Sequence, residues 1–241
     1  MRLDKYFTTV GLLSRRETAQ AVRRGRITVN GLAAASQDMA IDPETDVVTL
    51  DGEPVVYRRF VYLWLNKPAG YVSATEDGRL PVVTELAPPE YARLDLFPCG
   101  RLDRDTVGLL LLTNDGALTH ALLSPKRGVT KVYRFTTEGA LPDEAEERLA
   151  SGITAGGEIF RPAHLTADAD RMGGTVTLTE GKYHEVKRMM AALGAPIVSL
   201  ERIAFAGIDL DPHLARGECR PLTDREIAHL YAAAGLPKPK E

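Results

Sequence analysis

PCGRLDRDTVGLLLLTNDG, residues 98–116, holds the pattern on which the fold prediction depends. Four charged side chains stand directly before an apolar run: Arg101, Asp103, Arg104 and Asp105. The run GLLLLTN is typical of a buried strand, and the sequence Asn114-Asp115-Gly116 indicates that a helix begins there. A carboxylate beside such a strand costs free energy unless a cation pairs with it. Taken alone, the stretch fits a turn stabilised by an Asp–Arg pair as well as it fits a catalytic carboxylate.

Strands interrupted by isolated helices continue on both sides of this stretch. Residues 131–139, KVYRFTTEG, alternate as a strand, whereas residues 184–194 and 223–235 have helical spacing. Because strands and helices do not alternate strictly, the pattern predicts an α+β fold on a mainly antiparallel mixed sheet with flanking helices. The first 60 residues read as helix, helix and strand. We therefore expect a small module over 1–58, a larger domain over 59–235 and a tail over 236–241.

The composition is that of a soluble globular protein with uneven charge. The chain has 241 residues, with 44% hydrophobic and 26% charged residues and a net charge of −3. No apolar run reaches the length of a transmembrane helix, and the N-terminus has no signal-peptide pattern. The two cysteines, Cys99 and Cys219, suggest neither a disulfide framework nor a zinc site. We expect a cytoplasmic monomer that needs no metal or cofactor and binds no membrane.

Positive charge is concentrated at the N-terminus, where residues 1–31 contain seven Arg or Lys and two acidic residues. Ser14 and Glu17 form a capping-box pattern before a helix that ends at Gly25. Ala19 and Val22 are expected to supply its apolar face. A basic stripe of this kind suits the phosphate backbone of a nucleic acid, although a solvated helix face is the simpler alternative. The predicted RNA-binding cations are Arg2, Lys5, Arg15, Arg16, Arg23, Arg24 and Arg26.

The same segment resembles a known module. RLDKY followed by SRRETAQAVRRGRITVNG is similar to the alpha-L RNA-binding motif, found in a ribosomal small-subunit protein and in several RNA-modifying enzymes. The resemblance covers about the first 60 residues and implies binding to structured RNA. It adds Ser14 and Asn30 to the predicted RNA-binding set.

Three further motifs together resemble the ribosomal RNA pseudouridine synthases. They are GRLDRDTVGLLLLTNDG, KVY at 131–133, and EGKYHEVKRMMAALG followed by VSLER. With the N-terminal module, the resemblance favours the small-subunit branch and covers nearly the whole chain. KVY places Lys131 and Tyr133 on one face of a strand.

The resemblance implies a role for each matching residue. Asp103 corresponds to the catalytic aspartate, and Lys187 to the cation that pairs with it. Tyr133 corresponds to the phenol that packs on the target base. Arg101 corresponds to the arginine that helps to expel the nucleotide from its stack, and Leu200 lies in the apolar wall of the base site. Two positions depart from the family pattern: Cys99 stands where an aliphatic residue is common, and Glu185 where glutamine is common.

These motifs predict an isomerase that converts one uridine of 16S ribosomal RNA to pseudouridine, with rRNA in a partly assembled small subunit as its partner. The same reaction on 23S rRNA and a non-catalytic rRNA assembly factor stay as alternatives. A glycosidase would need two carboxylates across a sugar, and we expect Asp105 to point away from Asp103. A cysteine hydrolase would use Cys99, but no histidine is placed beside it by the sequence pattern.

Overall fold

The structure is a computed structural model in which residues 1–239 are described, and they form two compact units. The first unit comprises Met1–Val61, Pro88–Leu96 and Pro239. The second comprises Tyr62–Ala87 and Phe97–Lys238. Helices and mixed sheets confirm the predicted α+β class. The sequence did not indicate that residues 88–96 group with the N-terminal unit. In the predicted tail, residues 240 and 241 lie outside the described residues, whereas the Leu236 N–H donates to the Tyr231 carbonyl.

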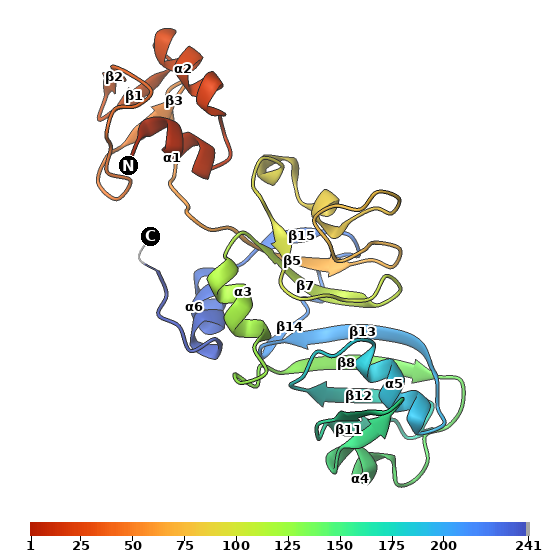
Figure 1. Cartoon of the computed structure of the whole chain (residues 1–241). Coiled ribbons are helices and arrows are strands. Elements are labelled where there is room, and N and C mark those ends of the chain that lie inside the picture. The colour runs from red at the N-terminus through yellow and green to blue at the C-terminus, as the bar shows by residue number, and fades with distance from the viewer. Residues whose placement is uncertain (240–241) are drawn as a thin grey trace. The chain divides into compact units, whose positions relative to one another are not determined.

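The N-terminal unit begins with two short helices, α1 (Leu3–Thr9) and α2 (Arg15–Arg23) (Figure 1). The predicted capping box is present, because the Glu17 N–H donates to Ser14 Oγ at 3.2 Å and the Ser14 N–H donates to the Glu17 carboxylate at 2.7 Å. The predicted apolar face is confirmed in part: Val22 packs against the core of this unit, but the fully buried residues of α2 are Thr18 and Ala21 rather than Ala19. The Thr18 hydroxyl donates to the Ser14 carbonyl at 2.9 Å, so that its polar atom is satisfied inside the unit.

A four-stranded antiparallel sheet completes this unit, in the order β2-β1-β3-β4. Its strands are β1 (Ile27–Val29), β2 (Leu32–Ala33), β3 (Val48–Leu50) and β4 (Glu53–Pro54). The turns at Asn30-Gly31 and Asp51-Gly52 have positive φ at both residues, as predicted for such hairpins. Leu3, Tyr6 and Phe7 of α1 pack with Ile27 and Val48 in one small core.

Residues 88–96 contact the helical part of this unit. They contain the short helix η2 (Pro89–Tyr91), after which the Arg93 guanidinium donates to both carboxylate oxygens of Glu17 and to the Leu12 carbonyl. The hydrogen bond from Arg93 and those from Ser14 lower the pKa of Glu17 to about 2. Glu17 therefore accepts hydrogen bonds both from the N-cap residue of α2 and from Arg93 in residues 88–96.

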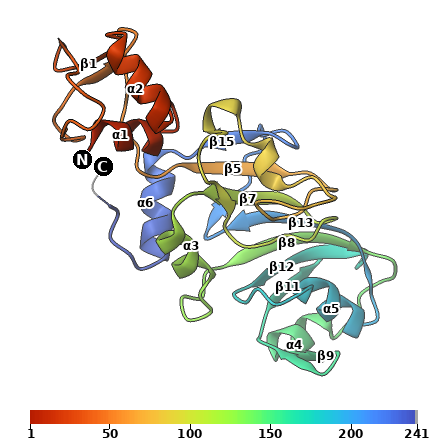
Figure 2. The same cartoon turned by 45° about the horizontal axis from the view of Figure 1, so that its top comes forward.

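A large sheet forms the second unit, in the order β11-β12-β8-β13-β7-β5-β15 (Figures 1 and 2). All of its neighbouring pairs are antiparallel except β13 with β7. Two short strands extend it, because β14 pairs with β13 and β6 pairs with β7. The strands are β5 (Tyr62–Lys67), β6 (Phe97–Pro98), β7 (Val107–Thr113), β8 (Lys131–Thr137), β11 (His164–Ala167), β12 (Gly173–Leu178), β13 (Ile197–Phe205), β14 (Ile208–Asp209) and β15 (Cys219–Pro221).

The opening stretch forms the middle of this sheet. Leu109, Leu110, Leu111 and Leu112 of β7 are each at most 1% exposed, so the strand is buried on both faces. Gly108 lies against β13, where a Cβ would stand 2.3 Å from the Arg202 carbonyl oxygen. The charged residues 101–105 therefore lie on the loop that leads into this apolar strand.

Helices and a small hairpin flank the sheet. Asp115 caps α3 (Gly116–Leu123) by accepting the Leu118 N–H at 3.0 Å, as the sequence indicated. Helix α3 lies beside α6 (Asp224–Ala233), and α4 (Ala145–Ala150) lies beside β11 (Figure 2). Helix α5 (Glu185–Ala192) contacts the hairpin of β9 (Ile153–Ala155) and β10 (Glu158–Phe160), and η1 spans Val83–Leu86. Within residues 1–239, no helix has both the length and the apolar character to cross a bilayer.

Candidate active site

The loop between β6 and β7 holds Asp103 in a turn. The Thr106 N–H donates to the Asp103 carbonyl at 3.1 Å, and positive φ values at Gly100 and Gly108 bound the segment. The Ser73 hydroxyl donates to the Leu102 carbonyl at 2.8 Å and accepts the Leu102 N–H at 3.0 Å. Ser73, which is 5% exposed, thus fixes the backbone directly before Asp103.

A buried lysine stabilises the same turn by hydrogen bonds to its backbone carbonyls. Lys67, at the end of β5, is 0% exposed. Its ammonium donates to the carbonyls of Asp103 at 3.0 Å, Thr106 at 2.8 Å, Arg104 at 3.3 Å and Pro68 at 3.1 Å. Burial lowers the pKa of Lys67 to about 8, although the charges of the two aspartates act in the opposite direction. The amine is therefore mostly protonated at neutral pH.

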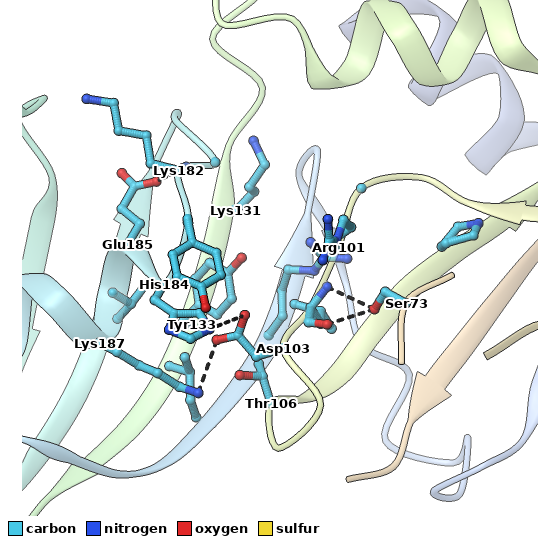
Figure 3. Close-up of a pocket in the computed structure, with 18 of the residues that line it drawn as sticks. Ser73, Arg101, Asp103, Thr106, Lys131, Tyr133, Lys182, His184, Glu185 and Lys187 are labelled. Carbon is cyan, nitrogen blue, oxygen red and sulfur yellow. Dashed lines mark hydrogen bonds and ion pairs between the residues drawn. The ribbon is translucent and has the colours of Figure 1, made fainter. Parts of the chain in front are cut away.

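The Asp103 carboxylate has two basic neighbours, one in the first turn of α5 and one at the residue before that helix (Figure 3). Lys187 Nζ lies 3.0 Å from Asp103 Oδ2, and His184 Nε2 lies 3.4 Å from Asp103 Oδ1. The side chain of Asp103 is 25% exposed. The structure thus pairs Asp103 with the lysine that the resemblance indicated.

Asp105 shares that lysine, contrary to the expectation that it points away from Asp103. Its Oδ1 lies 2.6 Å from Lys187 Nζ, with the carboxylate 75% exposed. Residues 103–106 form a turn rather than an extended strand, which brings both carboxylates to one amine. Burial alone would lower the pKa of Lys187, but the hydrogen bonds to Asp105 and Asp103 raise it. The hydrogen bond from Lys187 lowers the pKa of Asp105.

Strands β8 and β13 supply the wall behind Asp103. Tyr133 and Leu200 are each 8% exposed and line the same cavity as Asp103. Burial raises the pKa of the Tyr133 phenol, which is neutral at pH 7. Lys131 lines the cavity on the same strand face as Tyr133, which confirms the predicted alternation. Its ammonium donates to the Val129 carbonyl at 3.1 Å, and burial lowers its pKa.

The cavity has a volume of about 1010 Å³. Arg101 lines it as an exposed side chain, on the opposite side of Asp103 from Lys182 and Glu185 (Figure 3). Within the described residues, three buried polar atoms of the lining have no hydrogen-bond partner: Thr106 Oγ1, Glu185 Oε1 and Arg202 Nη2. Buried polar atoms are normally hydrogen-bonded, so these three atoms are exceptions within the cavity wall.

Glu185 does not disturb the pair of Asp103 and Lys187. Its Oε2 accepts the Lys182 N–H at 2.8 Å, and burial raises the pKa of its carboxyl group. His184 precedes the helix with φ 50°, instead of occupying a helical turn with Lys187 as the spacing suggested. That left-handed residue turns its ring toward Asp103. Arg188 is held elsewhere, by the Glu158 carboxylate at 2.6 Å.

The predicted RNA-binding side chains of the N-terminal unit are all exposed, and they divide into two groups. Four have structural partners: Ser14 caps α2, Asn30 bonds Asp46 and Val47, Arg2 pairs with Asp4, and Arg26 pairs with Asp51. Five form no ion pair or side-chain hydrogen bond within residues 1–239: Lys5, Arg15, Arg16, Arg23 and Arg24. The side chains of the second group are exposed and have no protein partner within the described residues.

Comparison with known proteins decides the family. Residues 61–192 match the family model described as RNA pseudouridylate synthase. The chain belongs to this family. It is an RNA pseudouridine synthase, an enzyme that isomerises uridine to pseudouridine. It is 45% identical to the "Uncharacterized RNA pseudouridine synthase YtzG" of Bacillus subtilis (strain 168), with 94% of this chain and 97% of that protein covered.

Two further relatives support the assignment. The synthase is 39% identical to "Ribosomal small subunit pseudouridine synthase A" of Escherichia coli (strain K12), over 95% of this chain and 99% of that one. A crystal structure described as pseudouridylate synthase matches with a TM-score of 0.67 and 36% identity, over 95% of this chain and 99% of the other. Each comparison spans both units of the synthase.

Sequence reasoning missed several residues of this pseudouridine synthase site. Lys67 ends the apolar run VYLWLN, and a lysine there is a signal that we did not use. Ser73 acts through a contact far away in sequence, and Arg202, the last residue of the VSLER motif, was not assigned a role although its Nε donates to the Leu109 carbonyl. Cys99 is 0% exposed, and burial raises the pKa of its thiol to about 11, which leaves no thiolate for a cysteine hydrolase at neutral pH.

Proposed function

We propose that this pseudouridine synthase modifies one uridine of small-subunit (16S) ribosomal RNA, with Asp103 as its catalytic residue. The observation that carries the proposal is the Asp103–Lys187 pair, 3.0 Å apart, in a cavity backed by Tyr133 and Leu200. The small-subunit assignment is supported by the relatives that are named for that subunit.

The reaction breaks the N1–C1′ bond of uridine, turns the uracil and joins C5 to C1′, while C5 loses a proton and N1 gains one. Atoms balance within the nucleotide, so the chain's own residues suffice for the steps that we assign. Asp103 acts on the sugar through its carboxylate, which pairs with the Lys187 ammonium at 3.0 Å beside an apolar wall. Tyr133, a neutral phenol, and Leu200 pack against the uracil while it turns.

The target uridine must leave its base stack to enter the cavity, which costs a few kcal/mol. Arg101, exposed at the cavity, is placed to stabilise the everted nucleotide. The N-terminal unit is proposed to be an RNA-binding module that holds the rRNA through phosphate contacts remote from the reaction. The cations proposed to make these contacts are the exposed Lys5, Arg15, Arg16, Arg23 and Arg24.

Rivals to this proposal differ in substrate or partner. The same chemistry on 23S rRNA would leave the site unchanged.

We propose that the enzyme acts as a monomer in the cytoplasm on rRNA in a partly assembled small subunit. Pseudouridine should be mapped in both rRNAs from cells with and without the protein, and in naked 16S RNA and assembly particles treated with the enzyme. A site that disappears from 23S rRNA alone would refute the small-subunit assignment.

Asp103→Asn tests the catalytic assignment, with Asp105→Asn as a matched control because both carboxylates contact Lys187. We expect Asp103→Asn to form no detectable pseudouridine while it still binds RNA, and Asp105→Asn to retain turnover. If Asp103→Asn turned over near the wild-type rate, Asp103 would be removed from the mechanism and a non-catalytic role for this loop would follow.

The RNA-binding module is tested by its salt dependence. Replacing Arg15, Arg16, Arg23 and Arg24 by Gln should reduce the slope of log K against log salt by about 0.7–0.9 for each phosphate that the variant no longer neutralises. Arg148→Gln in α4, an exposed arginine of the other unit, is the control. An unchanged slope in the quadruple variant would mean that α2 does not touch phosphates.

A further inference from the structure

Tyr183 is unusual among the aromatic residues of this chain because it is open to solvent. Its exposed fraction is 73%, and every other aromatic side chain within residues 1–239 is buried or half-buried. Tyr183 also lines the cavity that contains Asp103. An apolar ring left exposed beside the cavity of an RNA-modifying enzyme is a candidate for contact with a nucleobase.

The ring of Tyr183 is stacked on that of His184. Their centroids are 3.8 Å apart and their planes differ by 18°. His184 is itself fixed, since its Nε2 lies 3.4 Å from Asp103 Oδ1 and its backbone has φ 50°. Tyr183 therefore lies one ring layer from a side chain that contacts the catalytic carboxylate. The spacing is close to the rise of about 3.4 Å per nucleotide in a stacked strand.

The segment that carries the two rings is held firmly. The Lys182 N–H donates to Glu185 Oε2 at 2.8 Å. The Lys182 ammonium lies 5.1 Å from the centre of the Phe160 ring. Glu158 binds Arg188 at 2.6 Å and lies 3.5 Å from the Lys182 ammonium. The stacked pair is thus formed before any ligand arrives, so little ordering cost accompanies binding.

We propose that Tyr183, supported by His184, is a stacking platform for the nucleobase next to the target uridine in the RNA chain. The inference rests on the proposed function, in which the everted uracil packs on Tyr133 and Leu200. Both of these side chains are 8% exposed, so the target base lies deep in the cavity, whereas Tyr183 remains at its open side. Eversion leaves the neighbouring base without a stacking partner, and an exposed ring supplies one regardless of base identity.

The platform predicts a specific kinetic change. Tyr183→Ala should raise the KM for RNA about 5- to 150-fold, the range expected when one base–aromatic stack is removed. The kcat at saturating RNA should stay within about threefold of wild type, because Asp103, Lys187 and Tyr133 are untouched. Tyr183→Phe keeps the ring and should behave as wild type. Val198→Ala is the control for removal of an exposed apolar side chain, since Val198 is 66% exposed and does not line the cavity.

A fluorescent base analogue reports the stack directly. An RNA hairpin that the wild-type enzyme converts is prepared with 2-aminopurine on either side of the target uridine. Wild type and Tyr183→Phe should quench the analogue at one of these positions, and Tyr183→Ala should not. Unchanged quenching and KM in Tyr183→Ala would overturn the inference, as would an equal loss in Tyr183→Phe.

The choice of RNA separates this inference from the proposed function. Because the hairpin is defined by wild-type turnover, a target in 23S rRNA would change the hairpin and leave the test intact. Loss of turnover in Asp103→Asn together with a normal KM in Tyr183→Ala would support the catalytic proposal and refute the platform. A raised KM with no quenching in Tyr183→Ala supports the platform wherever the target uridine lies.

Discussion

Replacing Lys67 by Met removes one ammonium from beneath the Asp103 turn and keeps an apolar stem of similar length. Of the four carbonyl oxygens that Lys67 contacts, those of Asp103 and Arg104 keep backbone N–H donors. The oxygens of Pro68 and Thr106 lose their donor from Lys67. The Thr106 oxygen lies in a buried hydrogen bond and the Pro68 oxygen in a part-buried one, so the loss of both donors costs up to about 6 kcal/mol in total.

An opposite contribution comes from the charge itself. Burial lowers the pKa of Lys67 from 10.5 to about 8, which corresponds to about 3 kcal/mol of unfavourable free energy for the protonated form at neutral pH. Met carries no charge, so the variant does not incur this cost of burying the ammonium. We therefore expect Lys67→Met to lower the free energy of unfolding at pH 7 by no more than about 3 kcal/mol, as found when buried ions are replaced by apolar residues of similar volume.

Activity should respond far more strongly than stability. The turn that carries Asp103 loses its support, and a displacement of about 1 Å at a catalytic group costs about 10²-fold in rate. We expect kcat to fall by about that factor with KM little changed, measured as pseudouridine formed at saturating RNA. A kcat within threefold of wild type, or a loss of stability above about 5 kcal/mol, would refute the reasoning.

The pH dependence supplies an independent check on Lys67. Its folded pKa is below the unfolded value, so the unfolded state binds more protons between pH 8 and 10.5. The cost of the buried charge is fully present below pH 8 and disappears as the pH rises through that window. The stability of wild type relative to Lys67→Met should accordingly increase by about 3 kcal/mol from pH 8 to 10.5, measured by urea denaturation.

Three other variants test separate contacts. Ser73→Ala removes both hydrogen bonds to the Leu102 backbone and should lower kcat more than KM, whereas Ser73→Thr should restore part of the rate. Burial alone would raise the pKa of Glu226, but the hydrogen bonds from Arg220 and from Thr223, the N-cap residue of α6, lower it to about 2. Glu226→Gln should therefore lower the free energy of unfolding by about 3 kcal/mol above pH 4.5, and by progressively less as the pH falls toward 2. An acid titration of the stability difference that shows no such convergence would contradict this. Gly108→Ala should destabilise the fold by about 2 kcal/mol or more, seen as a lower Tm, because its Cβ would meet the β13 backbone at 2.3 Å and its φ is +103°.

Local signals in the sequence predicted local structure well. The predicted capping box forms at Ser14 with Glu17, and a second is present at Thr223 with Glu226, because each needs only residues within one helical turn. The Asn30-Gly31 hairpin likewise follows from the positive φ that its turn requires. These elements depend on their neighbours in sequence, so the sequence suffices for them.

The contacts that make the site depend on tertiary structure, and the local pattern did not contain them. Lys187 was identified as the partner of Asp103 by family resemblance, since nothing in the stretch around 103 points to a helix far along the chain. The prediction for Asp105 failed because it assumed an extended backbone, and even an extended strand would place residues 103 and 105 on the same face. Lys67 was missed because its partners are carbonyl oxygens, which leave no trace in side-chain patterns.

The distribution of cations suits the proposed function, in which one chain binds a polyanion and pairs the Asp103 carboxylate with an ammonium. The lysines that line the cavity are all committed to protein acceptors: Lys131 to a carbonyl, Lys187 to two carboxylates, and Lys182 to the Ile159 carbonyl and the carboxylates of Glu158 and Glu180. Lys67, beside the cavity, is committed to carbonyls. These amines set the position and charge of the site and have little capacity left for phosphates. Arg101 and the free cations of α2 are exposed and unpaired within residues 1–239, so the RNA backbone can be neutralised without drawing Lys187 away from Asp103. A net charge of −3 is compatible with rRNA binding for this reason, because affinity depends on where the uncommitted cations lie rather than on their excess over acids.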